Sequence, residues 1–164
     1  MAIDSRVSLI MTDDVISVEP DTEVTEAARL MWENDLSSLP VVEGGRVVGM
    51  LTDYDMIARE SEYDAPMYVP FLDAYFKIPG SGDSEQLRRI LATSVKDLMT
   101  SPALTIDPDT TVQQAATLMY DKRLNALPVV DADRRLIGIV SRADIVRLMV
   151  ADEDIFVRTH PEEA

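Results

Sequence analysis

The chain repeats itself at a shift of 88 residues, and this repeat constrains the fold more than any other feature of the sequence. Of the 32 positions from 11 to 42, 15 carry the residue found 88 positions later. Average composition predicts about two such matches by chance. After Val41-Val42 the shift becomes 89, so that Gly49 corresponds to Gly138. We therefore expect two similar structural units, each of which buries its open apolar face by stacking on the other.

The first half of each copy predicts a strand followed by an amphipathic helix. The apolar runs 15–18 and 103–106 are the strand candidates, and a proline ends each of them. Thr22 and Thr110 are the expected N-caps of the helices, and Gln113 lies at capping-box spacing after Thr110. Apolar residues then recur at helical spacing. The expected buried stripes are Val24, Ala27, Ala28, Met31 and Val112, Ala115, Ala116, Met119.

The second half of each copy predicts a hairpin and a second helix. The first hairpin joins 41–42 to 47–51 through Gly44-Gly45, which supplies the positive φ that a tight turn needs. The second helices begin near Asp53 and Arg142. The predicted fold is α/β, with two β-α-β-β-α repeats packed through their sheets about an approximate two-fold axis. Two equivalent clefts are expected where the repeats meet.

Composition excludes several function classes. The chain has 30 Asp and Glu against 15 Lys and Arg, and this net charge of −15 disfavours nucleic acid and anionic membrane surfaces as partners. There is no Cys, and the one His is His160. Thiol catalysis, His-based triads and multi-His metal sites are therefore not expected. Neither a secretory signal nor a membrane span is found in the sequence. We expect a cytoplasmic protein that is not an enzyme.

Three motifs, each present twice, resemble those of the cystathionine-β-synthase (CBS) domain. They are Met-Thr at 11–12 and 99–100, Leu-Pro-Val-Val at 39–42 and 127–130, and the closing runs 49–55 and 138–144. The closing runs have the pattern Gly-apolar-apolar-Thr/Ser-x-x-Asp. The whole chain is similar to a CBS-domain pair, or Bateman module, of the stand-alone bacterial type. This resemblance implies a regulatory module, and it implies a homodimer formed through the helices that flank the sheets.

The resemblance also implies two ligand sites for an adenosine-containing nucleotide. In CBS pairs the Asp of one closing run holds the ribose, while the base lies against the first strand and the residues before Leu-Pro of the other repeat. The second site would comprise Ser141, Arg142, Asp144, Val15, Ile16, Leu36 and Ser37. The first site would comprise Thr52, Asp55, Ala103, Leu104, Leu124 and Asn125. The candidate ligands are AMP, ADP, ATP and S-adenosylmethionine; no catalytic residue, metal site or required cofactor is expected.

The chemistry of the closing runs favours the second site. A hydroxyl and free N–H groups at a helix N-terminus suit an oxyanion. Nucleotide-binding members of the family often carry Arg or Lys directly before the Asp, whereas this chain has Tyr54 and Ala143 there. Arg142 adds a cation at the second site, but Asp53 would repel phosphate at the first. The alternative interpretation is that Thr52 and Ser141 only cap helices.

The resemblance covers 7–60 and 94–150, which leaves an insert at 61–93 and an acidic tail at 151–164. The insert holds five of the nine aromatic residues, at 63, 68, 71, 75 and 76. Its aromatic side chains predict a cover packed on the chain's own elements, with a subunit contact or a lid over one cleft as alternatives. Glu85 to Ala92 predicts a short helix. The tail is expected to be a solvated end.

Two functions of different class remain open at this point. One is a module that binds an adenosine nucleotide and signals the change to a regulated partner protein. The other is a ligand-free dimerisation or interaction module. A third, weaker hypothesis is a divalent-cation sensor, since the acidic chain offers many carboxylates.

Overall fold

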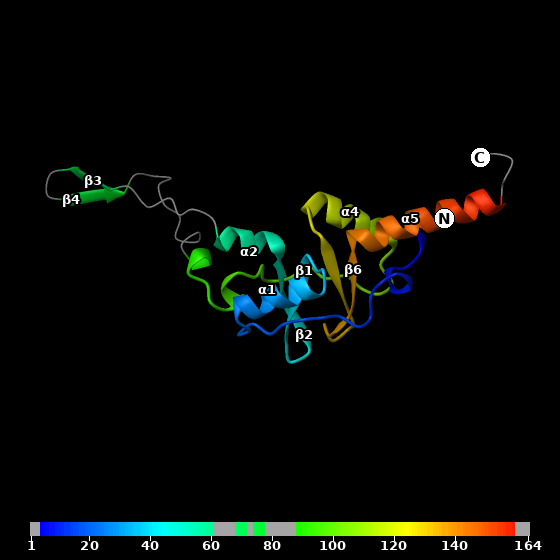
Figure 1. Cartoon of the computed structure of the whole chain (residues 1–164), viewed down its shortest axis with the longest axis horizontal. Helices are drawn as coiled ribbons and strands as arrows, with labels where there is room; N and C mark the ends of the chain where they lie inside the picture. Colours follow the sequence, from blue (N-terminus) through cyan, green and yellow to red (C-terminus); the bar gives the residue numbers. More distant parts are fainter. Residues whose placement is uncertain (1–3, 61–67, 72–73, 78–87, 160–164) are drawn as a thin grey trace. The chain divides into compact units, whose positions relative to one another are not determined.

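The computed structural model describes residues 4–60, 68–71, 74–77 and 88–159 (Figure 1). The chain divides into two compact units. Unit 1 comprises Met1–Ser17, Val42–Gly49 and Ser101–Ala164, and unit 2 comprises Val18–Val41 and Met50–Thr100. These units follow contacts in space and differ from the two sequence repeats, so the proposed repeat boundaries stay a prediction.

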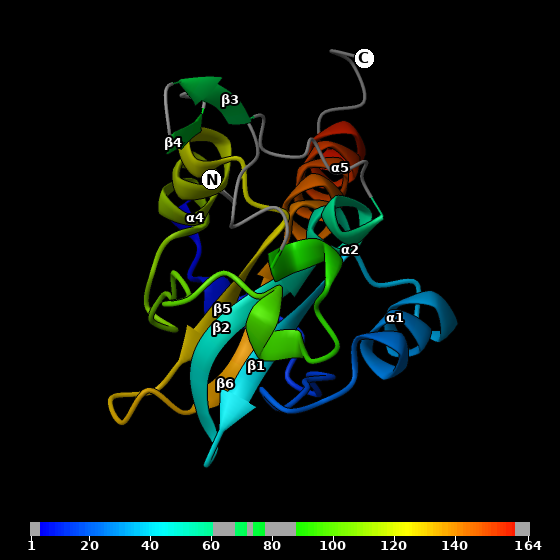
Figure 2. The same cartoon turned by 90° about the vertical axis from the view of Figure 1, so that its left-hand side faces the viewer.

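The elements of the first repeat are α1 (Val24–Glu33), β1 (Ser38–Glu43), β2 (Arg46–Thr52) and α2 (Asp53–Arg59). Those of the second are α4 (Val112–Lys122), β5 (Ala126–Val130), β6 (Leu136–Ser141) and α5 (Arg142–Thr159). A short 3-10 helix precedes each set, η2 (Val7–Leu9) and η3 (Val95–Asp97). Between the repeats, β3 (Tyr68–Phe71) and β4 (Ala74–Lys77) form an antiparallel hairpin. Figure 2 shows the same elements from the side.

The predicted helices and hairpins are confirmed. β1 pairs with β2 and β5 with β6, and the second helices begin at Asp53 and Arg142 as expected. Gly44 and Gly45 adopt φ of 58° and 81° in the first turn. The second turn has no glycine, and Arg134 takes the left-handed conformation there at a φ of 63°. In unit 1, α4 and α5 lie side by side and contact β5 and β6 respectively (Figure 1).

The expected helix stripes and caps need two corrections. Ala28 is exposed, because α1 buries only Val24, Ala27 and Met31, one residue per turn. The N-caps lie one residue later than predicted. Glu23 precedes α1 without a side-chain cap, and Thr111 with Gln114 forms the capping box of α4. Both Thr110 and Thr111 fit the sequence pattern, so the pattern alone does not fix which threonine is the cap.

The first strand of each repeat is reduced to a single parallel bridge, contrary to the predicted strands at 15–18 and 103–106. Val18 bridges to Val41, and Ile106 bridges to Val129. Ile106 N–H donates to the Pro128 carbonyl at 3.0 Å, and Val130 N–H donates to the Ile106 carbonyl at 3.0 Å. The next bond of a parallel ladder would need an N–H at Pro128, which proline lacks. The proline of Leu-Pro-Val-Val therefore stops the ladder.

The structure tests the predictions for the insert and the tail only in part. Of the predicted helix at 85–92, residues 88–90 are helical, and 85–87 lie outside the described residues. The aromatic side chains of the insert also lie outside what the structure describes, so their role stays a prediction. Residues 151–159 continue α5, and 160–164 lie outside the described residues, so the solvated tail stays a prediction.

The core of unit 1 includes a segment from the start of the chain. Val7 is fully buried in a cluster that otherwise comes from the second repeat. Its N–H donates to the Thr110 carbonyl at 2.8 Å, and Thr12 bridges to Ile139 of β6. The other members of the cluster are Ile106, Ala115, Met119, Leu127, Val129 and Val140. The stretch leading into the first repeat therefore completes the core of the second.

Unit 2 shows the reciprocal arrangement. Val95, which corresponds to Val7, is fully buried, and its N–H donates to the Thr22 carbonyl at 2.9 Å. Thr100 bridges to Met50, as Thr12 does to Ile139. Each Met-Thr motif therefore packs beside the closing strand of the opposite repeat.

The glycine of the second closing run permits this packing in unit 1. A Cβ atom at Gly138 would lie 2.5 Å from the Met11 sulfur and 3.0 Å from its Cγ. Such distances are well inside van der Waals contact, so a larger residue would displace Met11. The Met-Thr and Gly motifs are thus two sides of one contact.

Truncating Val7 tests the shared core. We expect Val7→Ala to lower the free energy of unfolding by about 1.5–3 kcal/mol, because a fully buried valine loses two methyl groups and leaves a cavity. Leu9→Ala is the control: Leu9 is 76% exposed in the same segment, and its loss should change stability by less than about 0.5 kcal/mol. Urea denaturation measures both. Equal effects of the two variants would contradict the packing described for Val7.

Candidate functional site

Ser141 and Asp144 form a compact hydrogen-bonded pair where β6 passes into α5. The Ser141 N–H and hydroxyl both donate to Asp144 Oδ2, at 2.8 and 2.7 Å. The Asp144 N–H donates back to Ser141 Oγ at 3.2 Å. This reciprocal bonding satisfies the first N–H groups of α5 and fixes the carboxylate at the end of the strand.

Thr52 and Asp55 repeat that geometry at the junction of β2 and α2. The Thr52 N–H and hydroxyl donate to Asp55 Oδ2 at 2.9 and 2.8 Å, and the Asp55 N–H donates to Thr52 Oγ1 at 3.2 Å. The capping role considered from the sequence is therefore confirmed at both closing runs. It leaves one carboxylate oxygen, Oδ1, on each Asp for a further partner.

An arginine faces that second oxygen in both runs, but from different places in the chain. Arg147 Nη1 lies 3.4 Å from Asp144 Oδ1, one turn along the same helix, and the Arg147 side chain is 78% exposed. Arg89 Nη1 lies 3.3 Å from Asp55 Oδ1, and its side chain is 29% exposed. Asp55 itself is 4% exposed and is one of two buried polar residues among those described. Neither arginine was predicted from the sequence.

Arg142 and Asn125, which were predicted for different sites, are brought together in unit 1. The Arg142 Nη2 donates to Asn125 Oδ1, and the Arg142 N–H donates to the Asn125 carbonyl at 3.0 Å. Unit 2 repeats the backbone bond, where Asp53 N–H donates to the Ser37 carbonyl at 3.0 Å. The residue two positions before Leu-Pro is therefore tied to the start of the closing helix in each repeat, and the Arg142 side chain is held beside Asn125.

The predicted base-binding residues lie beside the interrupted ladders. Ile16 and Leu104 are 36% and 42% exposed, high values for aliphatic side chains. Val15, Leu36, Leu124 and Asn125 are half-buried, Ala103 is buried and Ser37 is exposed. Val15 and Ile16 belong to unit 1, as do Ser141, Arg142 and Asp144. Leu36 and Ser37 belong to unit 2.

The members of the first site are also divided between units. Thr52 and Asp55 belong to unit 2, and the base-binding residues Ala103, Leu104, Leu124 and Asn125 belong to unit 1. The meeting of each carboxylate with its proposed base-binding residues therefore stays a prediction.

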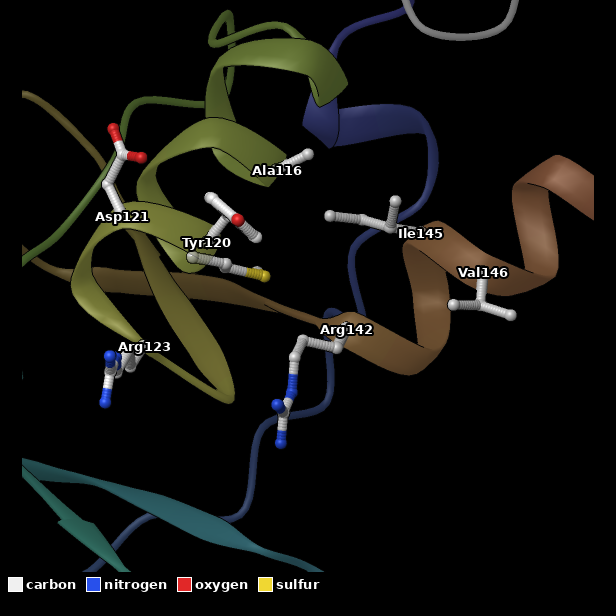
Figure 3. Close-up of a pocket in the computed structure, with 8 residues that line it drawn as sticks. Ala116, Tyr120, Asp121, Arg123, Arg142, Ile145 and Val146 are labelled. Atoms are coloured by element: carbon white, nitrogen blue, oxygen red, sulfur yellow. The ribbon is translucent and has the colours of Figure 1, made fainter.

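A pocket of about 820 Å³ opens between α4 and α5 in unit 1 (Figure 3). Arg123 and Arg142 supply cations at one end, with Asp121 nearby, and Ile145 and Val146 supply apolar surface at the other. The remaining lining residues are Ala116, Met119 and Tyr120. Arg123 closes α4 in the left-handed conformation at a φ of 55°.

Away from the closing runs, one ion pair shifts the pKa of a lysine. The hydrogen bond from Lys96 to Asp21, together with the charge of that carboxylate, raises the pKa of Lys96 above its ordinary value. Within the described ranges, no group of three or more His, Asp or Glu side chains is arranged to hold a metal ion. None of the helices in those ranges has the length and apolar character needed to cross a membrane.

The two arginines differ in whether the sequence could have predicted them. Arg147 lies three residues after Asp144 on the same predicted helix, so its proximity could have been read from helical spacing. Arg89 lies 34 residues from Asp55 within the insert, and no periodicity or motif connects the two.

The sequence model of the CBS domain family matches residues 7–62 and 95–151. CBSX1, a chloroplastic CBS domain-containing protein of Arabidopsis thaliana, is 33% identical over 141 residues, which cover 82% of this chain and 59% of CBSX1. YhcV of Bacillus subtilis is 29% identical over 149 residues, covering 91% and 89% of the two chains. The chain thus spans somewhat more than half the length of CBSX1 and nearly all of YhcV.

Solved structures agree with this assignment. CBSX2 of Arabidopsis thaliana in complex with AMP superimposes with a TM-score of 0.72 at 28% identity, covering 89% of this chain and 97% of that one. The CBS domain pair of MJ0100 shares the fold with a TM-score of 0.66 at 24% identity, covering 88% and 99%. The predicted fold class is confirmed, and the chain belongs to the CBS domain family, of which it carries two repeats.

Proposed function

We propose that this chain is a regulatory module that binds an adenosine-containing nucleotide, with AMP as the first candidate, and does no chemistry of its own. The observation that carries the proposal is the fixed carboxylate at the end of each closing strand. In both repeats one oxygen is used by the cap, and the other faces a charged partner that a ligand can replace. Vicinal ribose hydroxyls are a pair of donors that fits such an oxygen.

The AMP complex of CBSX2 supports this choice of ligand. That protein is 28% identical to this chain over most of the length of both. ADP, ATP and S-adenosylmethionine share the adenosine group and remain candidates on the same chemistry. We also propose that the module acts in the cytoplasm. There it binds a regulated protein, whose activity changes when the nucleotide is bound.

The second closing run is the stronger of the two proposed sites. Asp144 Oδ1 pairs with Arg147 of its own helix, whose side chain is 78% exposed, and an ion pair with so exposed a partner contributes about 0–1 kcal/mol. Arg142 adds a cation beside Ser141 for an oxyanion. α5 is 18 residues long, so its N-terminus carries a developed helix dipole.

Exposed apolar side chains on the helices support the alternative function, a dimerisation module. Large apolar side chains lie exposed at equivalent places of the two helix pairs. Trp32 of α1 corresponds to Tyr120 of α4, and these are 87% and 86% exposed. Ile57 of α2 corresponds to Val146 of α5, and these are 67% and 58% exposed. Such paired patches suit a subunit contact. We propose that the chain forms a homodimer through them and binds nucleotide as well. The cation-sensor hypothesis has no supporting observation of this kind.

Removing the carboxylates tests the nucleotide sites. Asp144→Ala should weaken AMP binding about ten- to hundredfold, because the ribose loses a charged acceptor worth roughly 1–3 kcal/mol. Asp55→Ala should weaken it less. Calorimetric titration with AMP, ADP, ATP and S-adenosylmethionine measures both effects.

Two controls separate binding from folding in that experiment. Asp133→Ala removes the same charge from an exposed position in the β5–β6 turn, and AMP affinity should stay within about twofold for so distant a surface charge. Circular dichroism should show folded variants, since a lost cap costs about 1 kcal/mol. Loss of binding in Asp55→Ala with full binding in Asp144→Ala would contradict the preferred site. A wild-type chain that binds no adenosine compound at millimolar concentration would leave the dimerisation module as the function.

Charging the helix patches tests the homodimer. Light scattering should give a dimer for the wild type at high micromolar concentration. Tyr120→Glu with Trp32→Glu should raise the dissociation constant at least about thirtyfold, since a buried interface aromatic contributes roughly 2 kcal/mol or more. Leu9→Glu, at a residue 76% exposed but outside these helices, is the matched control and should remain dimeric. A monomeric wild type would exclude this assembly.

A further inference from the structure

The two carboxylates proposed to bind ribose, Asp55 and Asp144, differ in the arginine that pairs with their Oδ1 atom. At Asp55, Oδ2 already accepts two hydrogen bonds from Thr52, at 2.9 and 2.8 Å. Oδ1 is therefore the oxygen with lone pairs left for a ligand. Arg89 donates to that atom at 3.3 Å. Arg89 takes one of the two acceptor positions of Oδ1, so a ribose whose two hydroxyls both donate to that oxygen has to displace the guanidinium.

Arg89 is held in place by the segment behind it. The Ala92 N–H donates to the Arg89 carbonyl at 3.2 Å, and Ala92 is 2% exposed. The next residue, Thr93, accepts a hydrogen bond from Val24 N–H at 3.0 Å. The guanidinium therefore comes from a chain segment anchored on unit 2, and the whole pair lies within that unit.

The equivalent pair in unit 1 has none of this support. Arg147 comes from the same helix as Asp144 and is 78% exposed, so it can rotate into solvent without disturbing any packed residue. An exposed pair three residues apart is weak. The two carboxylates are buried alike, with side chains 6% exposed at Asp55 and 10% at Asp144, but the Arg89 side chain is 29% exposed against 78% for Arg147. Burial reduces screening, so this pair resists displacement more strongly.

We propose that Arg89 sets the difference in affinity between the two nucleotide sites by occupying the Asp55 oxygen that a ribose would use. This inference rests on the proposed function and adds the residue that lowers the nucleotide affinity of the first site. A nucleotide enters the first site only at concentrations that displace Arg89, whereas the second site fills earlier. Filling of the first site then breaks the bond between Arg89 and its carboxylate, so occupancy of the first site is coupled to the short stretch 89–93 that holds Arg89.

Adenosine is the probe that isolates this competition, because it carries the ribose and base without a phosphate. Asp144→Ala serves as the background, so that binding reports on the first site. In that background Arg89→Gln should tighten adenosine binding about tenfold, the value expected when a hydrogen bond to a charged group no longer competes. Arg89→Lys keeps a cation and should tighten it less.

The matched control is the unit 1 pair. In an Asp55→Ala background, Arg147→Gln should change adenosine affinity by less than about threefold, since the exposed pair is weak.

Two results would overturn the role of Arg89. One is unchanged or weaker adenosine binding when Arg89→Gln is added to Asp144→Ala. This includes the case in which that double variant binds no adenosine while Asp55→Ala still binds it at the second site. The other is weaker AMP binding with unchanged adenosine binding, which would make Arg89 a phosphate contact. Failure of the proposed function has a different signature: neither the wild type nor any single variant binds adenosine or AMP. Thermal melting identifies a variant that does not fold, and Arg89→Lys then decides.

Discussion

The burial of each leading segment in the opposite repeat is the contact on which the rest of the structure depends. Val7 fills the core of the unit built from the second repeat, and Val95 does the same in the other unit. A repeat of this size has only a marginal core on its own. The exchange gives each unit a buried side chain and a backbone bridge from elsewhere in the chain. It also places each Met-Thr motif beside a closing strand, the strand that ends in the Ser or Thr of a candidate site.

One carboxylate in each repeat gives its two oxygens to different partners. Oδ2 closes the hydrogen bonds at the start of a helix, which holds the side chain in one rotamer. Oδ1 is thereby aimed away from the cap and toward a partner. A capping role and a ligand role are thus compatible, since the cap fixes the geometry that a ligand requires. The sequence alone presents the two roles as alternatives, because the residue pattern is the same for both.

Most of the fold could be predicted because it repeats, and a pattern seen twice is unlikely to be accidental. The helices, hairpins and closing runs follow from apolar spacing and turn residues that the two copies share. The first strands could not be predicted correctly, because Val15–Val18 has the composition of a strand while its ladder is stopped by a proline far along the chain. The cap at Thr111 was missed for a local reason, since two adjacent threonines fit. Arg89 was missed because its partner lies 34 residues away.

The differences between the repeats give the two closing runs unequal surroundings. The shared positions are those that the core and the caps require, and they leave the charged positions free to diverge. Asp53 stands where the second repeat has Arg142, so the mouths of the two runs carry opposite charge. Arg89 then brings a cation to the acidic run from outside the repeat. In a chain with a net charge of −15, a guanidinium on a buried carboxylate lowers the cost of burying that charge. The same pairing occupies the oxygen that the proposed ligand would use, so under the proposal stability and affinity oppose each other more at the first site than at the second.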